Sequence, residues 1–444
     1  MIKAFYKSIY LNPRFFYAAG AMVTLFCLSF VWSILFPISQ FMLFALLALT
    51  GIDAFITLRQ EHIVGHRKTP KILSLGDEQN VYITLENFGN LRLKVKLIEE
   101  LPAQLQQRNF EIKTVLLPNK QTELDYSIRP LSRGEYHFGQ LNAFIQTPLG
   151  FVERKVELAK PAMVKVYPSI IQMKQFELMA FTRVSSVQGL RKIRRIGHSY
   201  EFEQIKNYVR GDDFRSINWK ATSRYNQLMV NQYEDEKSQN IYSIVDKSRA
   251  MKLPFNGLTL MEHAINTSLV ISNIILKKYD KAGLITFSDL LGSVVQSDRG
   301  KKQLPKILDT LYNERDRKTE ADYERLYQAV TKVVRTRSLL FLYTNFESSL
   351  SAMRILPILR KLNKRHLLVV VFFENTEVTD FSKRDVDSLK DIYLNTIAKE
   401  AVVDKEQIVN KLKQFGIQTI LTKPEELSLH TVNKYLELKA RGMI

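Results

Sequence analysis

Three acidic residues lie close together in the most densely charged stretch of the chain, 191–236. Glu203, Asp212 and Asp213 alternate there with several arginines and lysines. Grouped carboxylates are what a two-metal centre or an acid–base pair needs. Arginines flank both aspartates, however, and a guanidinium group binds a carboxylate bidentately and fixes its orientation. Because structural ion pairs are commoner than active sites, this charge mixing favours an ion-pair network that locks two domains together.

The basic residues of the same stretch allow a second interpretation, the binding of nucleic-acid phosphates. The chain has 64 Lys and Arg against 45 Asp and Glu, a formal net charge of +19 that suits an anionic partner. No aromatic platform or known nucleic-acid motif accompanies the basic run, so we do not expect nucleic acid as a partner. We attribute the charge bias to a position near an anionic cytoplasmic lipid surface.

A second set of polar residues follows two apolar runs that are typical of buried strands. Asp246 and Ser248 come directly after the run 241–245, and Asn345 follows the run 338–344. Ligands of doubly wound sheets bind beyond the carboxyl ends of the strands. The sequence has no glycine-rich phosphate loop, and its histidines lack triad or metal-ligand spacing. We therefore expect no catalytic residues, no enzymatic activity and no small-molecule substrate.

Residues 237–444 alternate apolar runs with helical patterns. The predicted strands are 241–245, 282–287, 338–344, 366–373 and 418–422. The predicted helices are 259–279, 301–312, 322–334, 349–363, 388–402, 405–415 and 425–439. Continuous apolar strands that alternate with helices predict a parallel sheet covered on both faces. This part is therefore predicted to be a doubly wound α/β domain.

Residues 61–170 have a different rhythm, with polar and apolar residues alternating over short runs. These runs are 80–87, 92–100, 123–130, 135–146 and 155–159, and turn residues separate them. Short alternating strands with regular turns predict a β-sandwich domain. The charged stretch lies in a junction, 171–236, between this domain and the α/β domain, so the fold class is α+β multidomain.

Two long apolar runs precede the β-sandwich. Residues 15–36 carry no charge, and after a break at 37–40 the run 41–58 has Asp53 as its only charge. A bilayer span needs about 20 residues, so 1–60 is predicted to be a transmembrane helical hairpin. We expect Asp53 to lie near the lipid headgroups.

Charges on either side of the two runs set the predicted orientation. Arg14 precedes the first run, Arg67 and Lys68 follow the second, and the break between the runs is uncharged. The positive-inside rule therefore places both termini in the cytoplasm.

The chain has a single cysteine, Cys27, so it forms no internal disulfide. A single cysteine also excludes a zinc site of the paired-cysteine type.

The run EFEQIKNYVRGDDFRSINWKATSR, 201–224, resembles the signature of the domain of unknown function 58 family. The matching positions are Glu201, Phe202, Tyr208, Gly211, Asp212, Asp213, Arg215, Asn218, Trp219 and Arg224. The similarity extends along nearly the whole chain. The segment 129–155 resembles another family region, with Thr147 where Asp is usual, and 430–442 resembles the C-terminal helix.

The resemblance implies two N-terminal membrane spans and a von Willebrand A-like C-terminal domain. Family members are typically encoded near MoxR-type AAA+ ATPases and are thought to work with them. The resemblance therefore implies a non-enzymatic adaptor that spans the bacterial inner membrane more than once. Such an adaptor would present its cytoplasmic A-like domain to an ATPase of this type. Two alternatives remain: a membrane-tethered hydrolase that uses the acidic residues of the GDD stretch, and a basic nucleic-acid binder.

The A-domain fold often holds Mg²⁺ through a D-x-S-x-S pattern, a Thr and a later Asp. Asp246 and Ser248 match the first two places, and Thr319 is the candidate Thr. Ala250 replaces the second Ser, and Asn345 stands where the late Asp would be. These replacements remove oxygen ligands and a negative charge that Mg²⁺ needs. The pattern therefore favours Asp246 as a cap of a loop or helix. We expect no cofactor, and Mg²⁺ is the one candidate.

Overall fold

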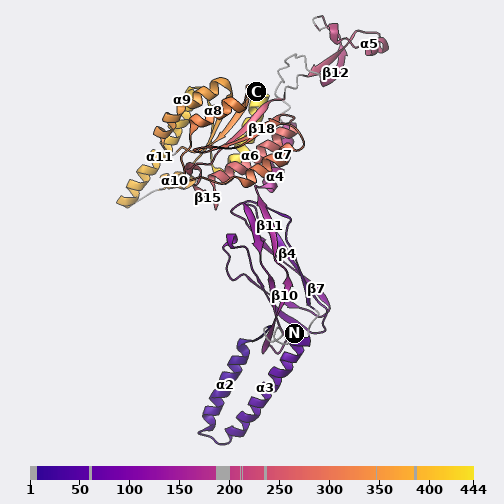
Figure 1. Ribbon diagram of the computed structural model, residues 1–444, viewed down its shortest axis with the longest axis vertical. Helices are drawn as coiled ribbons and strands as arrows, with labels where there is room; N and C mark the ends of the chain where they lie inside the picture. The colour runs from indigo at the N-terminus through magenta and orange to yellow at the C-terminus, as the bar shows by residue number, and fades with distance from the viewer. Residues whose placement is uncertain are drawn as a thin grey trace. The chain divides into compact units, whose positions relative to one another are not determined.

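The computed structural model describes residues 8–59, 63–186, 201–210, 212, 214–234, 238–346, 348–384 and 388–444 (Figure 1). It is a mixed α/β structure with several sheets. The chain divides into two compact units, Met1–Tyr167 and Pro168–Ile444, and each is described by itself.

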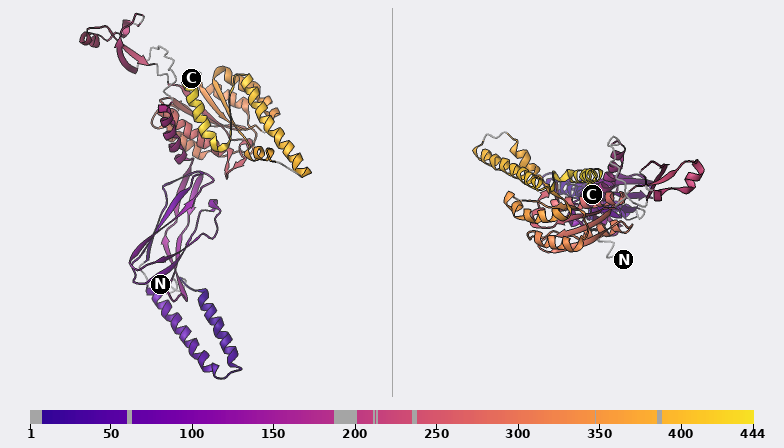
Figure 2. Two further views of the ribbon diagram at one scale, coloured as in Figure 1. Left: turned by 180° about the vertical axis from the view of Figure 1, so that it is seen from behind. Right: turned by 90° about the horizontal axis from the view of Figure 1, so that it is seen from above.

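The first unit contains two apolar helices, α2 (Pro13–Ser29) and α3 (Leu35–Arg59), which lie side by side (Figures 1 and 2). Pro13 begins α2, where its missing N–H is not needed. Pro37 likewise falls in the first turn of α3, a position that tolerates proline. The predicted break at 37–40 is therefore wrong, because the two helices are separated at 30–34 instead.

Only α3, among the helices that the structure describes, is long and apolar enough to cross a membrane, over Leu35–Leu58. Helix α2 has 17 residues and ends at Ser29. The predicted first span, 15–36, is thus too long by about two helical turns at its C-terminal end.

Asp53 is buried and connects α3 to the strands of the same unit. Its Oδ2 accepts hydrogen bonds from the backbone N–H groups of Phe151 (2.8 Å) and Val152 (3.0 Å), and Thr147 Oγ1 donates to its Oδ1. The Asp53 carboxylate is thus enclosed by protein groups, and its position near lipid headgroups stays a prediction. Arg154 Nη1 adds a bond to the Leu58 carbonyl, 3.0 Å long.

Three sheets make up the rest of the first unit. A five-stranded antiparallel sheet has the order β1 (Ile9–Leu11), β10 (Val152–Ala159), β9 (Leu141–Gln146), β5 (Leu93–Glu99), β6 (Glu111–Leu116). A second has the order β2 (Ile63–Lys68), β4 (Gln79–Asn87), β7 (Lys120–Ile128), and a third β3 (Ile72–Ser74), β11 (Ala162–Tyr167), β8 (Gly134–Phe138). All five predicted runs contain strands. The run 135–146 divides into two strands of different sheets at Gly139, whose N–H donates to the Glu100 carbonyl (2.8 Å).

The second unit is built on a six-stranded sheet. Its order is β18 (Leu291–Asp298), β17 (Lys281–Phe287), β14 (Asn240–Asp246), β19 (Leu339–Tyr343), β20 (Leu367–Phe373), β21 (Gln418–Thr422). β18 is antiparallel to its neighbour, and the five other strands are parallel and coincide with the five predicted strands. Because each parallel strand returns through a helix, apolar residues point to both faces of the sheet.

Helices pack on both faces of this sheet. One face carries α4 (Ile170–Ser186), α6 (Leu260–Lys277), α7 (Gln303–Asn313) and α12 (Leu427–Ala440). The other face carries α8 (Tyr323–Val333), α9 (Ser349–Arg365) and α11 (Leu389–Gln414). The short elements are α10 (Thr376–Ser382), β15 (Pro254–Phe255) and β16 (Leu258–Thr259). The predicted helices 388–402 and 405–415 form the single helix α11, because nothing at Val403 or Asp404 interrupts it.

Candidate functional site

The signature residues fall in a small hairpin. β12 (Glu201–Asn207) pairs antiparallel with β13 (Met229–Glu234), and α5 (Trp219–Tyr225) lies in the connection between them. Glu201 and Phe202 are the first two residues of β12. The signature residues thus follow one another along a strand, a turn and a capped helix.

Asp212 is bound within its own segment. Its Oδ1 accepts a hydrogen bond from Lys206 Nζ (2.9 Å), and its Oδ2 accepts one from the Val209 N–H (3.0 Å). These hydrogen bonds lower the pKa of Asp212, that of Lys206 most strongly. Asp212 therefore pairs locally, which corrects the predicted inter-domain network at this residue. Gly211 and Asp213 lie outside the described residues.

Asn218 explains the I-N-W part of the signature. Its Oδ1 accepts from the Ala221 N–H (3.0 Å) and so caps α5, while its Nδ2 donates to Asn231 Oδ1 on β13 (2.8 Å). A short amide side chain at a helix N-terminus can satisfy a free N–H in this way. The neighbouring Tyr208 N–H donates to the Leu228 carbonyl (2.7 Å). These bonds define the geometry of the turn between β12 and β13.

Several large signature side chains point to solvent. Trp219 is 68% exposed and Phe214 is 70% exposed. The Arg215 guanidinium lies 5.9 Å from the centre of the Phe214 ring, and Arg224 is in the last turn of α5. Exposed aromatic and arginine side chains are typical of surfaces that bind other macromolecules.

A buried carboxylate lies at the carboxyl end of β14. Asp246 is 1% exposed, and its Oδ1 accepts from the Ser248 N–H (2.8 Å) while its Oδ2 accepts from Thr344 Oγ1 (2.8 Å). Tyr323 OH is 2.6 Å from the same Thr344 oxygen. Burial raises the pKa of Asp246 despite these hydrogen bonds. A buried ionisable group with a perturbed pKa at a strand end is a candidate functional residue.

The other predicted metal ligands are used elsewhere. Thr319 Oγ1 donates to Asp289 Oδ1 (2.7 Å), although its carbonyl accepts from the Arg249 N–H (2.9 Å). Asn345 Nδ2 donates to the Ala250 carbonyl (3.3 Å). The chain fold therefore brings the loop of Thr319 to that of Asp246 without turning the hydroxyl toward the carboxylate.

The donor set at this strand edge does not fit Mg²⁺. Asn345 Oδ1, the oxygen at the late-Asp position, accepts a hydrogen bond from the Lys405 ammonium group at 2.9 Å. Mg²⁺ prefers several oxygen ligands with net negative charge, and a nearby ammonium ion repels it. Asp246 instead bonds the backbone two residues ahead, which is the geometry of a loop cap.

A buried ion pair begins at the residue directly after Asp246. Lys247 Nζ is 2.6 Å from Glu314 Oε2, and Thr286 Oγ1 donates to Glu314 Oε1 (2.9 Å). Burial alone would raise the pKa of Glu314, but the hydrogen bonds from Lys247 and other donors outweigh burial, and the pKa is lowered. No sequence pattern predicts this pair, because its two residues are 67 positions apart and match no motif.

Comparisons with known proteins support the signature. The family model described as "Protein of unknown function DUF58" matches residues 204–384. "Uncharacterized protein YeaD" of Bacillus subtilis (strain 168) is 26% identical over 260 residues, which cover 57% of this chain and 61% of that protein. The chain thus spans less than two thirds of the length of this relative. Both matches support the resemblance of this chain to the DUF58 family, whose function is unknown.

Solved structures resemble parts of the chain. The conserved hypothetical protein BatB from Bacteroides thetaiotaomicron has a TM-score of 0.23 and 12% identity, over 32% of this chain and 69% of that chain. PapD-like domain 7 of human CEP192 has a TM-score of 0.18 and 12% identity, over 24% of this chain and 86% of that chain.

Proposed function

We propose that this chain is a membrane-anchored, non-enzymatic adaptor of the DUF58 family. Its second unit is a von Willebrand A-like domain that it presents to a protein partner, a MoxR-type AAA+ ATPase. The proposal is carried by one observation, the exposure of Phe214, Trp219 and Tyr225 in a segment whose polar signature residues maintain the fold.

The chemistry of the signature favours binding over hydrolysis. Aromatic and arginine side chains contribute most of the binding energy at protein interfaces. Asp212, the described acidic residue of the GDD stretch, has a lowered pKa and an ion pair with Lys206. A general acid or base works best with a pKa near the operating pH, so this carboxylate is poorly suited to that role.

The anchor consists of α2 and α3, which both cross the bacterial inner membrane with both chain termini in the cytoplasm. The two helices expose large apolar side chains such as Phe16, Phe41 and Phe44. Helix α2 is about 26 Å long at 1.5 Å per residue. The apolar residues Phe30, Val31 and Trp32 that follow it extend the apolar length toward the ~30 Å of a bilayer core.

The test is capture of the full-length protein from its own cells in mild detergent, with partners identified by mass spectrometry. Wild type should recover a MoxR-type ATPase, and Trp219→Ala should lower that recovery at least tenfold, because a central interface tryptophan contributes about 2 kcal/mol or more. Leu350→Ala is the matched control, since Leu350 on α9 is 78% exposed and lies outside the signature. Recovery of the protein alone, or equal recovery by Trp219→Ala, would overturn the adaptor proposal.

A further inference from the structure

Strand β21 has a free edge. It is the last strand of the six-stranded sheet, and within the described chain it pairs only with β20. The Glu374 N–H donates to the Thr422 carbonyl (3.0 Å), so Thr422 directs its backbone groups toward β20. Backbone direction alternates along a strand, so Thr419 and Leu421 direct their N–H and C=O groups toward the open edge.

These outward groups are available for pairing. Over the ranges that the structure describes, no hydrogen bond reaches the backbone N–H or C=O of Thr419 or Leu421. The side-chain oxygen of Thr419 is also buried without a hydrogen-bond partner. An extended peptide that lies along an open edge bonds to such groups through its own main chain.

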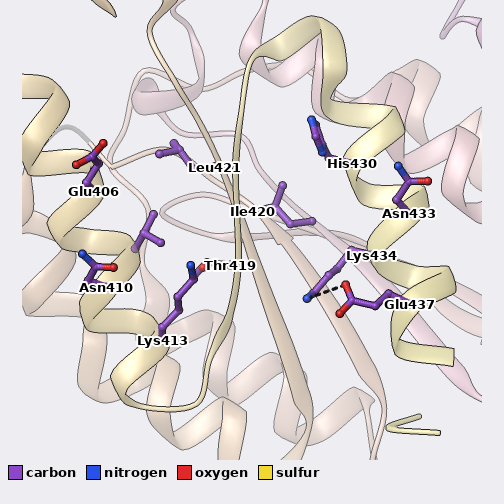
Figure 3. Close-up of a pocket in the computed structure, with 11 residues that line it drawn as sticks. Glu406, Asn410, Lys413, Thr419, Ile420, Leu421, His430, Asn433, Lys434 and Glu437 are labelled. Carbon is purple, nitrogen blue, oxygen red and sulfur yellow. Dashed lines mark hydrogen bonds and ion pairs between the residues drawn. The ribbon is translucent and has the colours of Figure 1, made fainter. Parts of the chain in front are cut away.

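A groove of about 750 Å³ follows this edge (Figure 3). Glu406, Asn410 and Lys413 of α11 form one wall, at the spacing of a single helix face. Figure 3 shows β21 between this wall and α12, which contributes His430 and Lys434. The volume lies in the range of binding pockets, about 300–1,000 Å³.

The two walls differ in the charges that they leave for a ligand. On α12, Lys434 pairs with Glu437 (3.2 Å) and His430 contacts Glu426 (3.3 Å). On α11, neither Glu406 nor Lys413 forms an ion pair with another described residue. Figure 3 places Lys413 toward the Thr419 end of the strand and Glu406 toward the Leu421 end.

The α11 wall therefore presents one unpaired charge of each sign along the groove. Glu406 and Lys413 are two helical turns apart, about 10 Å. This separation corresponds to about three or four residues of an extended chain.

We propose that this groove binds an extended peptide segment of a partner protein, which adds to β21 as a seventh strand. An acidic side chain of the peptide lies beside Lys413, and a basic side chain on the same peptide face lies beside Glu406. A second copy of this chain fits less well, because its own α11 and α12 would meet the two walls. Peptide binding at this groove extends the proposed adaptor role. It depends on that role only for the claim that the peptide belongs to the adaptor's partner.

Binding can be measured on the full chain in detergent micelles by fluorescence anisotropy. The probes are labelled seven-residue peptides in which Thr alternates with Val, Ile or an aromatic residue. One set has glutamate at the second position and lysine at the sixth, and the other set has the two charges exchanged. Wild type should bind one set roughly threefold to tenfold more tightly than the other, as expected for two solvent-exposed ion pairs.

The double variant Glu406→Lys with Lys413→Glu should exchange this preference. The control variant Lys399→Glu with Glu400→Lys has the same net charge, changes exposed residues of the same helix outside the groove, and should keep the wild-type preference. A peptide that is N-methylated at alternate backbone positions should lose at least tenfold in affinity, because it cannot form the ladder.

Hydrogen exchange locates the peptide independently of its affinity. Bound peptide should slow exchange of the Thr419 and Leu421 amides at least tenfold. The proposal is overturned if no peptide binds below about 1 mM, if the charge exchange leaves the preference unchanged, or if these amides stay unprotected. Protection of the edge without peptide, together with dimers in light scattering, would assign the edge to a second copy. Failure of peptide binding would leave ATPase capture unaffected, so the two proposals can fail separately.

Discussion

The Asp246 carboxylate is buried among neutral hydrogen-bond donors, and this has a consequence for stability. Burial raises its pKa in the folded state above the unfolded value of about 3.9. Between these two pKa values the folded state binds more protons than the unfolded state, so stability falls as pH rises through this window.

Asp246→Asn should therefore stabilise the protein at neutral pH. The amide keeps an oxygen for the Ser248 N–H and removes the cost of a buried charge. We expect Tm to rise by about 2–4 °C for each kcal/mol recovered at pH 7, and the difference from wild type to vanish below about pH 4. Thermal unfolding between about pH 3 and pH 8 measures this. A lower Tm for the variant at pH 7 would mean that interactions of the carboxylate outweigh the cost of its burial, contrary to this prediction.

The Lys247–Glu314 pair predicts the opposite pH dependence. The pKa of Glu314 is lowered, so its contribution is present above the unfolded value of about 4.3 and is lost as pH falls through the folded pKa. Lys247→Met leaves a buried carboxylate without its partner and should cost about 3–5 kcal/mol. The double variant with Glu314→Gln should recover most of this loss in urea unfolding. Full additivity of the two single variants would contradict the coupling.

The hydrogen-bond partners of Asp246 could be predicted only in part from the sequence. The D-x-S spacing identified Asp246 and Ser248, because both lie in one loop. Thr344 was missed as the partner of Asp246, since the pairing of β14 with β19 brings it there from 98 residues away. Thr319 was chosen by residue type, and its hydroxyl bonds Asp289 instead.

At the scale of elements, strand β2 carries one arginine whose side chain is buried. Arg67 Nη1 is 2.9 Å from Glu99 Oε1 and 3.1 Å from the Gly139 carbonyl, and the two charged side chains are 2% and 1% exposed. By its place in the sequence, Arg67 was predicted to be one of the charges near the membrane. In the structure it joins β2 to β5, which belongs to a different sheet.

Arg67→Met should lower the free energy of unfolding by about 3–5 kcal/mol, because Glu99 would remain buried without its partner. Lys68→Met is the control, since this neighbouring side chain is exposed and should change stability by less than about 0.5 kcal/mol. Denaturant unfolding in detergent compares the two. Equal effects would indicate that the Arg67 pair contributes no more than a surface charge.

Element types followed from local patterns, whereas boundaries depended on contacts. The five parallel strands were predicted because continuous apolar runs need burial on both faces. The break between α2 and α3 was misplaced because proline is tolerated in a first helical turn as well as in a loop. The division of 135–146 at Gly139 depends on bonds to Glu100 and Arg67, which no local pattern reveals.

At the scale of the whole molecule, the proposed orientation can be tested with single cysteines. Cys27 is the only native cysteine, so Cys27→Ser gives a thiol-free background. In spheroplasts, a membrane-impermeant maleimide should label Trp32→Cys between the two helices and should not label Leu350→Cys until lysis. Labelling of Leu350→Cys in intact spheroplasts would contradict a cytoplasmic second unit.

The predicted domain boundary lies at residue 60, and hydrogen bonds connect the two sides of that boundary. Asp53 and Leu58 of α3 accept hydrogen bonds from Phe151, Val152 and Arg154 of the five-stranded sheet and the turn before it. Hydrogen bonds therefore join α3 to the five-stranded sheet. If α3 tilts or rotates in a bilayer of different thickness, we expect this sheet to change its orientation together with the helix.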